Sequence, residues 1–424
     1  MHYHGSGVNI MALPTVIIGA GLAGLCCARQ IHRAGRPFLL LDASDTVGGR
    51  VRTDRLDGFL LDRGFQVLLT AYPEAQAQLD YAALDLKTFT PGALVRVDGA
   101  FHKVVDPWRR PVDAMLNALS PIGSLSDKAR VALMRQRLLG DSVDAIATHP
   151  EQRTIELLHD AGFSATMIDR FFRPFFGGVL FDAELNTSSR MFEFVFRMFA
   201  TGDTAIPAGG MEAIPRQLAS TLPADAIRTG VRIAGITDDG VVTTTGERLA
   251  AQAVVIATEG DEAARLLDVP RPRAPRSCTC VYFAADRPPV SEPLLILDGE
   301  RSGPVNNLAV VSNVAPSYAP PGAALISATL IGDADQPDEA LVPMMRHQLT
   351  AWFGASVSGW RHLRSYRIRY AQPDQTPPAL DPLSRPVRVK PGLYVCGDHL
   401  ETASIHGAMR SGRLAGDACL SDFA

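Results

Sequence analysis

Residues 16–53 read VIIGAGLAGLCCARQIHRAGRPFLLLDASDTVGGRVRT. In this stretch a short apolar run leads into a glycine-rich turn, and a segment with a helical pattern follows to about residue 34. A second apolar run, 38–41, then ends in Asp42. Strand, glycine-rich turn, helix, strand and carboxylate in this order predict a dinucleotide-binding βαβ unit.

Each glycine of the turn has a separate predicted role. Gly19 permits the tight turn, Gly21 lets a pyrophosphate approach the backbone, and Gly24 allows the helix to pack close to the strand. The helix begins at about Leu22 and Ala23, where free N–H groups and the helix dipole face the phosphate charge. We therefore assign these five residues to a cofactor-binding site.

Asp42 and its neighbour Ala43 complete the predicted nucleotide site, because a carboxylate here accepts hydrogen bonds from both ribose hydroxyls. The motif Gly48-Gly49-Arg50 follows. Its paired glycines bring a loop close to the cofactor, and the guanidinium of Arg50 is suited to charge-assisted hydrogen bonds with a phosphate. Nicotinamide dehydrogenases have no regular need for this motif, so it favours FAD over NAD.

With this signature the chain resembles the flavin-containing amine oxidase superfamily. That group includes monoamine and polyamine oxidases, protoporphyrinogen oxidase, phytoene desaturases and carotenoid isomerases. Its members share a GxGxxG turn, an acidic ribose ligand and a GGR motif. The resemblance implies FAD as the cofactor and an α/β fold, with a Rossmann-like FAD-binding domain and an inserted α+β substrate domain.

Two further segments support the resemblance. Residues 61–66 read LDRGFQ, and residues 392–412 read GLYVCGDHLETASIHGAMRSG. The resemblance places the first beside the isoalloxazine. It places the second at the ribityl or pyrophosphate region and at the flavin O2 edge, where a helix N-terminus stabilises negative charge. It also implies a residue that touches the adenine. The site residues implied in this way are Gly64, Phe65, Gln66, Val231, Gly397, Asp398, Ser404, Ile405, His406 and Ala408.

Three side chains, His406, Gln66 and Tyr370, are candidates for a catalytic role, with Tyr366 as the alternative to Tyr370. His406 stands at the expected start of the C-terminal helix, where it is placed to donate to flavin or substrate or to act as a base; the alternative is a surface histidine. Gln66 is a candidate polar group beside the flavin. Tyr370 and Tyr366 precede Ala-Gln-Pro at 371–373, which resembles an element of the superfamily, and either tyrosine is a candidate to face the flavin.

The cofactor-binding segments are scattered along the chain, so we expect a discontinuous domain. Turn residues and alternation in 206–258 predict helix, strand, hairpin and strand, and the superfamily places this block in the FAD domain. We assign 13–72, 205–271 and 387–424 to the FAD-binding domain, and 73–204 and 272–386 to the substrate-binding domain.

Composition limits the class of protein. The 424 residues are too many for one core, which indicates two domains. A net charge of −4, from 41 basic and 45 acidic residues, gives no sign of nucleic-acid binding. The six cysteines lack zinc-binding spacing, so we predict no metal site, and they indicate a reduced, cytoplasmic protein. No apolar run is long enough to span a bilayer, and residues 1–10 are expected to be a vector-derived or unstructured tail.

Residues 163–199 hold ten of the eighteen phenylalanines. The plain interpretation is a helical core; the alternative is an apolar tunnel for a lipophilic substrate, or a patch in peripheral contact with a membrane. The loop 106–111 is a second candidate patch, or an ordinary solvated loop. Amine oxidases of the superfamily usually place a lysine near flavin N5, yet no lysine lies between Lys128 and Lys390. This absence favours the desaturase-like branch.

The sequence thus predicts an FAD-dependent oxidoreductase that removes hydride from a C–H of an apolar small molecule, with oxygen or a quinone as the electron acceptor. Three alternatives stay open at this point: a flavin amine oxidase, a non-redox isomerase that uses reduced FAD, and a non-catalytic FAD-containing protein.

Overall fold

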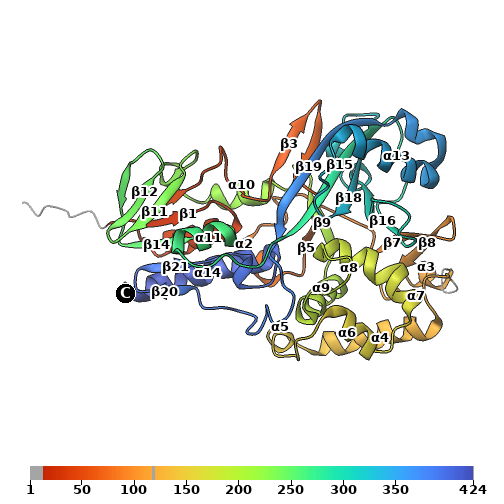
Figure 1. Ribbon diagram of the computed structural model, residues 1–424, viewed down its shortest axis with the longest axis horizontal. Coiled ribbons are helices and arrows are strands. Elements are labelled where there is room, and N and C mark those ends of the chain that lie inside the picture. The colour runs from red at the N-terminus through yellow and green to blue at the C-terminus, as the bar shows by residue number, and fades with distance from the viewer. Residues whose placement is uncertain (1–12, 117–119, 424) are drawn as a thin grey trace, which may run out of the picture.

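The chain folds into two bodies built on separate β-sheets (Figure 1). The computed structural model describes residues 13–116 and 120–423, so the tail expected at 1–10 lies outside the described residues. One body holds a largely parallel six-stranded sheet and carries the C-terminus. The other holds a seven-stranded sheet and a group of helices. The two longest strands, β15 (Arg276–Ala285) and β19 (Arg361–Gln372), extend from the second body toward the first.

The six-stranded sheet is assembled from three distant segments of the chain. Its order is β10-β2-β1-β14-β21-β20, and all neighbours are parallel except β20 and β21. The apolar runs of the nucleotide motif form β1 and β2 inside this sheet. The strands are β10 (Ile227–Arg228), β2 (Phe38–Leu41), β1 (Thr15–Ile18), β14 (Ala253–Ile256), β21 (Leu393–Val395) and β20 (Arg388–Lys390).

Both faces of this sheet are covered, which explains why its central strands are apolar at consecutive positions. Ile17 belongs to the core under the helices α1 (Leu22–Arg33) and α14 (Ile405–Asp422). Val16, on the opposite face, belongs to a second core formed with a small antiparallel sheet of β11, β12 and β13. The further elements of this body are α10 (Ala213–Ala219), β11 (Ile233–Thr237), β12 (Gly240–Thr243), β13 (Arg248–Ala250) and α11 (Gly260–Leu267).

Helices α1 and α14 pack backbone against backbone. A Cβ atom on Gly412 of α14 would lie 2.0 Å from the carbonyl oxygen of Ala23 in α1. A Cβ atom on Gly24 would lie 1.8 Å from the carbonyl oxygen of Gly19, in the turn before the helix. Glycine at 412 lets α14 lie directly against α1, and glycine at 24 lets α1 lie directly against the glycine-rich turn. The C-terminal helix therefore lies near that turn, although the two segments are far apart in sequence.

The seven-stranded sheet of the second body has the order β19-β15-β18-β17-β16-β7-β8. Its neighbours are antiparallel, except β16 and β7. The amphipathic helix α13 (Asp338–Phe353) covers one face and encloses a core that includes Phe283 and Trp352. The other strands are β18 (Ala324–Ile331), β17 (Asn307–Val310), β16 (Leu295–Asp298), β7 (Gly92–Val97) and β8 (Ala100–Val105).

A group of helices lies below this sheet in Figure 1 and contains most of the phenylalanine-rich stretch. Phe172, Phe176 and Phe192 are buried and pack ring against ring. This part of the stretch is therefore helical core, as the plain interpretation predicts. The helices are α4 (Leu125–Gly140), α5 (Val143–Ile146), α6 (Thr154–Asp160), α7 (Ala165–Met167), a π-helical turn (Ile168–Phe172), α8 (Arg173–Leu180) and α9 (Ser189–Thr201).

Short elements connect the two bodies. The hairpin of β3 and β4 follows the GGR motif, and β9 pairs with both β5 and β6. Their bounds, with those of the remaining helices, are β3 (Thr53–Leu56), β4 (Phe59–Asp62), β5 (Leu68–Leu69), α2 (Pro73–Gln78), β6 (Leu86–Thr88), α3 (Pro111–Leu116), β9 (Thr204–Pro207) and α12 (Val311–Val314). Among the described helices, none combines the length and hydropathy that a membrane span requires.

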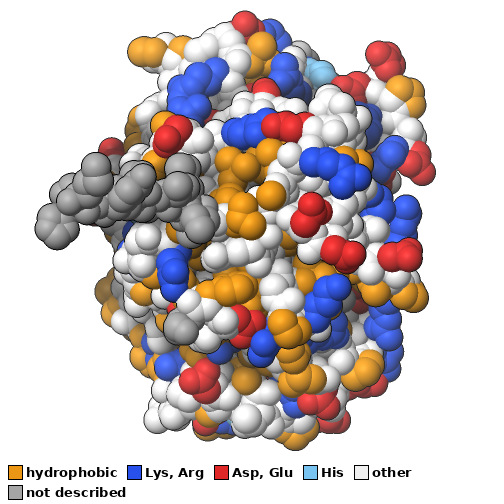
Figure 2. Space-filling model, turned by 90° about the vertical axis from the view of Figure 1, so that its left-hand side faces the viewer, with side chains coloured by type: hydrophobic (Ala, Val, Ile, Leu, Met, Phe, Trp, Pro, Cys, Tyr) orange, Lys and Arg blue, Asp and Glu red, His pale blue; other side chains and the backbone are white. Residues whose placement is uncertain are grey.

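The predicted fold class is confirmed: a Rossmann-like α/β body is joined to a mixed α+β body. The domain boundaries themselves stay a prediction. Figure 2 shows the end of the molecule that carries the six-stranded sheet, where basic and acidic side chains of the described residues are interspersed. This mixed surface agrees with the small net charge of the chain.

Candidate active site

A cavity of about 1290 Å³ lies between the two bodies. Drug-sized ligands occupy pockets of roughly 300–1,000 Å³, so this space is large enough for a dinucleotide and a second molecule. One half is formed by loops at the ends of β1, β2, β14 and β21. The other half is formed by β19, β15 and the helices α8 and α9.

Most of the residues that the sequence assigns to the site line this one cavity. Segments that are far apart in the chain meet here because parallel strands place their carboxyl ends at the same edge of a sheet. Gly24 and His406 do not line the cavity. Those that do are Gly19, Gly21, Leu22, Ala23, Asp42, Ala43, Gly48, Gly49, Arg50, Gly64, Phe65, Gln66, Val231, Tyr370, Gly397, Asp398, Ser404, Ile405 and Ala408.

The glycine-rich turn has the geometry of a phosphate cradle. Gly19 has φ +108°, and a Cβ there would lie 2.6 Å from the carbonyl oxygen of Ala257, so only glycine fits. Helix α1 starts after Gly21 with no side-chain cap and no acidic residue in its first turn. The loop of Gly49 comes so close that a Cβ on it would lie 3.2 Å from the Cα of Gly21. The first N–H groups of α1 have no capping side chain, and Gly21 and Gly49 have no side chains to keep a ligand away from the backbone. This arrangement suits a pyrophosphate.

Asp42 is held at the edge of the cavity by backbone amides. One carboxylate oxygen accepts a hydrogen bond from the N–H of Ala20 at 2.6 Å, and the other accepts from the N–H of Ser44 at 2.7 Å. Each carboxylate oxygen has a further lone pair. The side chain is therefore oriented in advance and still able to accept from a ribose hydroxyl.

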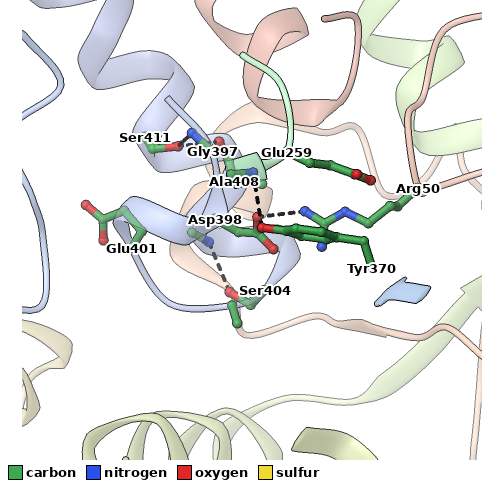
Figure 3. Close-up of polar contacts among 12 residues, drawn as sticks. Arg50, Glu259, Tyr370, Gly397, Asp398, Glu401, Ser404, Ala408 and Ser411 are labelled. Carbon is green, nitrogen blue, oxygen red and sulfur yellow. Dashed lines mark hydrogen bonds and ion pairs between the residues drawn. The ribbon is translucent and has the colours of Figure 1, made fainter. Parts of the chain in front are cut away.

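Arg50 is fixed by three partners, of which Figure 3 labels Asp398 and Tyr370. It donates to Asp398 at 2.6 Å and to the carbonyl oxygen of Ala371 at 2.9 Å, while its guanidinium lies 5.4 Å from the centre of the Tyr370 ring. Burial alone would lower the pKa of Arg50, but the attraction of buried Asp398 outweighs it and holds the pKa above its ordinary value. The arginine is a permanent cation in the wall of the cavity.

The loop that carries Asp398 is also held in place. Gly397 donates its N–H to the hydroxyl of Ser411 in α14 at 2.9 Å, which ties the end of β21 to the C-terminal helix (Figure 3). Glu259, which immediately precedes α11, also lines the cavity beside this loop. Burial raises the pKa of Glu259, and Arg50 partly opposes that shift. The sequence reasoning did not select Glu259.

Gln66 has one satisfied end and one unsatisfied end. Its amide nitrogen donates to the carbonyl oxygens of Arg50 and Arg63 at 2.9 and 3.0 Å. Its Oε1 is buried, and no donor from the described residues reaches it. A buried acceptor without a partner is costly, so a ligand N–H in the cavity would satisfy it. The uncapped helix start and this orphaned oxygen both fit a flavin dinucleotide.

His406 does not lie where the sequence predicts. Its Nδ1 accepts a hydrogen bond from the N–H of Glu74 at 3.2 Å, and its ring packs against Tyr72 and Phe194. Burial lowers the pKa of His406 to about 4, so the ring is neutral near pH 7. Its predicted position at the cavity is wrong in this structure, because successive residues of a helix point about 100° apart and here Ile405 takes the inward position.

The substrate half of the cavity has an apolar wall. Part of the phenylalanine-rich stretch faces the cavity, since Phe175 and Phe199 line it while their neighbours form core; a tunnel for a lipophilic substrate stays a prediction. Further apolar residues along this wall are Val179, Met191, Val195, Leu295 and Ile368. The loop 106–111 is partly exposed at Trp108, which lies under the guanidinium of Arg135.

The sequence reasoning selected the tyrosines of β19 but missed the arginines of that strand and Asp54 of β3. Asp54, Arg364, Arg367 and Arg369 line the cavity beside Tyr366, which was one of the two tyrosines considered. The only signal was the alternation of arginine with other residues in RHLRSYRIRY, residues 361–370. No described residue of the cavity wall is a lysine. Among the described residues, no group of His, Cys, Asp or Glu is placed to hold a metal ion.

Residues 22–420 match the sequence model of a family described as flavin containing amine oxidoreductase. The chain belongs to this family. It is thus a flavoprotein of an oxidoreductase family, and its cofactor is FAD. The glycine-rich turn, Arg50 and Gln66 are the parts of the cavity that fit this cofactor.

Similarity to individual proteins is narrower. Lysine-specific histone demethylase 1B of Mus musculus is 40% identical over 68 residues, which are 16% of this chain and 7% of that protein. Coproporphyrinogen III oxidase of Propionibacterium freudenreichii subsp. freudenreichii is 28% identical over 176 residues, 39% of this chain and 31% of that protein. These matches span less than a third of either relative.

Solved structures extend the likeness of fold to the whole chain. A crystal structure of an oxidoreductase from Methanosarcina mazei superposes with a TM-score of 0.72 at 19% identity. The superposition covers 96% of this chain and 100% of that chain. At this identity the likeness concerns the fold alone.

Proposed function

We propose that this family member is an FAD-dependent oxidoreductase that removes hydride from a C–H of an apolar small molecule, with oxygen or a quinone as the final electron acceptor. The observation that carries the proposal is the apolar wall formed by α8 and α9, opposite the cofactor half of a single cavity.

The chain's own residues hold the cofactor and leave the hydride chemistry to it. The amides at the start of α1 and the guanidinium of Arg50 would bind phosphate, and Asp42 would bind ribose. Gln66 Oε1 would accept from a ring N–H. Bound FAD supplies an acceptor for two electrons and a proton.

The substrate side offers positioning rather than a base. Burial raises the pKa of Cys278 and Tyr366 above their ordinary values, so both stay protonated near pH 7. Burial also acts to raise the pKa of Asp54, but hydrogen bonds from Arg63 and Tyr366 outweigh it and lower that pKa. A general base works best with a pKa near the operating pH, and none of these three groups has one. Hydride removal from a C–H activated by the substrate itself suits such a wall.

Amine oxidation is less well supported. The lysine that amine oxidases of the superfamily usually hold near the flavin has no counterpart among the described residues of the cavity wall. We therefore expect benzylamine and putrescine to be poor substrates.

The test is anaerobic bleaching of the flavin absorbance by a panel of polyenes, porphyrinogens, benzylamine and putrescine. We expect a polyene or a porphyrinogen to reduce the flavin and the two amines to react slowly or not at all. Rapid bleaching by an amine, with hydrogen peroxide released in air, would replace the proposal with amine oxidation. Product formation from reduced flavin without consumption of an acceptor would indicate an isomerase.

A matched pair of variants links the chemistry to the apolar wall. Phe175 lines the cavity, whereas its stacking partner Phe171, 5.5 Å away between ring centres, does not. We expect Phe175→Ser to weaken substrate binding more than Phe171→Ser. If both variants weaken substrate binding equally, the apolar wall stabilises the fold and does not contact the substrate.

A further inference from the structure

Four polar side chains meet on the cavity wall between the β3–β4 hairpin and β19. They are Asp54, Arg63, Arg364 and Tyr366, and each of them lines the cavity. Asp54 on β3 and Arg63 just after β4 lie side by side at the open end of the hairpin, and Arg364 and Tyr366 lie on β19. The fold therefore brings together charges from two separate segments.

The hydrogen bonds of this cluster centre on Asp54, and the guanidinium of Arg364 also lies 5.9 Å from the centre of the Tyr366 ring. Arg63 donates to its two oxygens at 3.0 to 3.3 Å, Arg364 donates at 3.3 Å, and the Tyr366 hydroxyl donates at 2.8 Å. One carboxylate thus receives two guanidinium groups and a phenol. The cluster keeps a net positive charge, because a single anion faces two permanent cations.

The two arginines keep unused donors. Among the described residues, no hydrogen bond engages Nη1 of Arg63 or the Nε and Nη2 atoms of Arg364. Their side chains are 39% and 43% exposed, so a ligand in the cavity has access to them. A guanidinium with free N–H groups matches the two oxygens of a carboxylate.

Two other arginines of β19 provide a comparison. Arg367 and Arg369 also line the cavity, but Arg367 pairs with Asp338 and Arg369 pairs with Asp333. Each of them pairs with a different aspartate, whereas Arg63 and Arg364 share Asp54. Among these four arginines of the described cavity wall, this sharing distinguishes the part at Asp54.

We propose that Arg63 and Arg364 form a carboxylate-binding subsite, and that the otherwise apolar substrate carries a carboxylate at one end. Its carboxylate lies on these two arginines, and its apolar part lies along the wall that includes Phe175, Val179 and Phe199. That the bound acid is a substrate rests on the proposed oxidoreductase function. The subsite itself rests only on the geometry of the four side chains.

The test measures binding to the oxidised, FAD-loaded protein by calorimetry, without turnover. The probes are octanoate, octanamide, octyl phosphate and octylamine, which share one apolar chain and differ in the head group. We expect octanoate to bind at least tenfold more tightly than octanamide or octylamine. Equal affinity for octanoate and octanamide, or tighter binding of octyl phosphate than of octanoate, would overturn the carboxylate assignment.

Three variants locate the effect. Arg364→Gln should weaken octanoate at least tenfold and leave octanamide unchanged. Arg369→Gln, the matched control on the same strand, should change neither. Asp54→Asn should tighten octanoate, because it removes the anion that competes for the two arginines. Equal losses in the two arginine variants, or no gain in Asp54→Asn, would overturn the subsite.

The two proposals fail separately. If no apolar compound reduces the flavin, the proposed function is wrong. The calorimetric comparison of octanoate with octanamide still tests the subsite, because it needs no turnover. If the flavin is reduced by an uncharged polyene and octanoate binds no better than octanamide, the oxidoreductase function holds and the subsite is wrong.

Discussion

Gly24→Ala tests whether folding stability and FAD binding depend on the close contact between helix α1 and the turn that precedes it. A Cβ at residue 24 would lie 1.8 Å from the carbonyl oxygen of Gly19 and 3.3 Å from the Cβ of Ala257. Because ordinary contact begins near 3.4 Å, helix and turn would have to separate by more than about 1 Å in a close-packed interior. The nearest atom belongs to the backbone and cannot rotate away. We therefore expect a loss of about 3 kcal/mol in the free energy of unfolding, the upper end of the usual cost of overpacking.

The same displacement should weaken cofactor binding, since the turn that moves carries Gly19 and Gly21. The assay is the midpoint of thermal unfolding for the FAD-free protein, together with the FAD dissociation constant from flavin fluorescence. Gly140→Ala is the matched control: a Cβ at this position in α4 meets nothing within 4 Å, so the change should be neutral or stabilising by roughly 0.5–1 kcal/mol. If Gly24→Ala unfolds at the same temperature and binds FAD as tightly as the control, the close-packing argument is refuted.

Two further predictions concern single side chains of the site. Asp42→Ala should weaken FAD at least tenfold, since hydrogen bonds to a charged group contribute roughly 1.5–3 kcal/mol each and about 1.4 kcal/mol is tenfold; unchanged FAD affinity would remove Asp42 as the ribose ligand. His406→Asn should leave the flavin reduction potential unchanged, and a shifted potential would return His406 to the flavin. The pKa of His406 is lowered from 6.5 to about 4, so the unfolded chain takes up the proton first. The stability it contributes is complete above about pH 6.5 and is lost as the pH falls toward 4, and the Asn variant should lack this part of the acid sensitivity in urea unfolding curves.

The sequence predicted the cofactor half of the site in detail because its features are local. A glycine-rich turn between a strand and a helix has one geometry, and Gly19 shows why: its φ of +108° and the nearby Ala257 carbonyl admit no side chain. Parallel strand ends then bring Asp42, Arg50 and Asp398 to one edge of the sheet. The motif and the sheet topology together therefore determine where these residues lie.

The substrate half was predicted only in outline, because its residues meet through long-range packing. Phe172 and Phe175 stand three positions apart, yet one is fully buried core and the other lines the cavity. Composition shows that the stretch is aromatic, but it does not show which side of a helix faces a cavity. The same limit applies to Asp54 and Arg364, whose contact depends on how the β3–β4 hairpin lies against β19.

The position of His406 depends on which face of α14 packs against α1. In α14, Gly412 and Gly416 lie against α1, where a Cβ on either would come within 3 Å of Ala23 or Gln30. Ile405 and Ala408 share this face of the helix by their spacing of three, four or seven residues, and both reach the cavity.

His406 and Arg413 lie seven residues apart and share a different face. Both contact Glu74 of α2, through its N–H and its carboxylate respectively. The glycine pair was visible in the sequence. If the face of α14 with Gly412 and Gly416 lies against α1, the helical repeat places Ile405 on that same face. It places His406 on a different face, away from the flavin site.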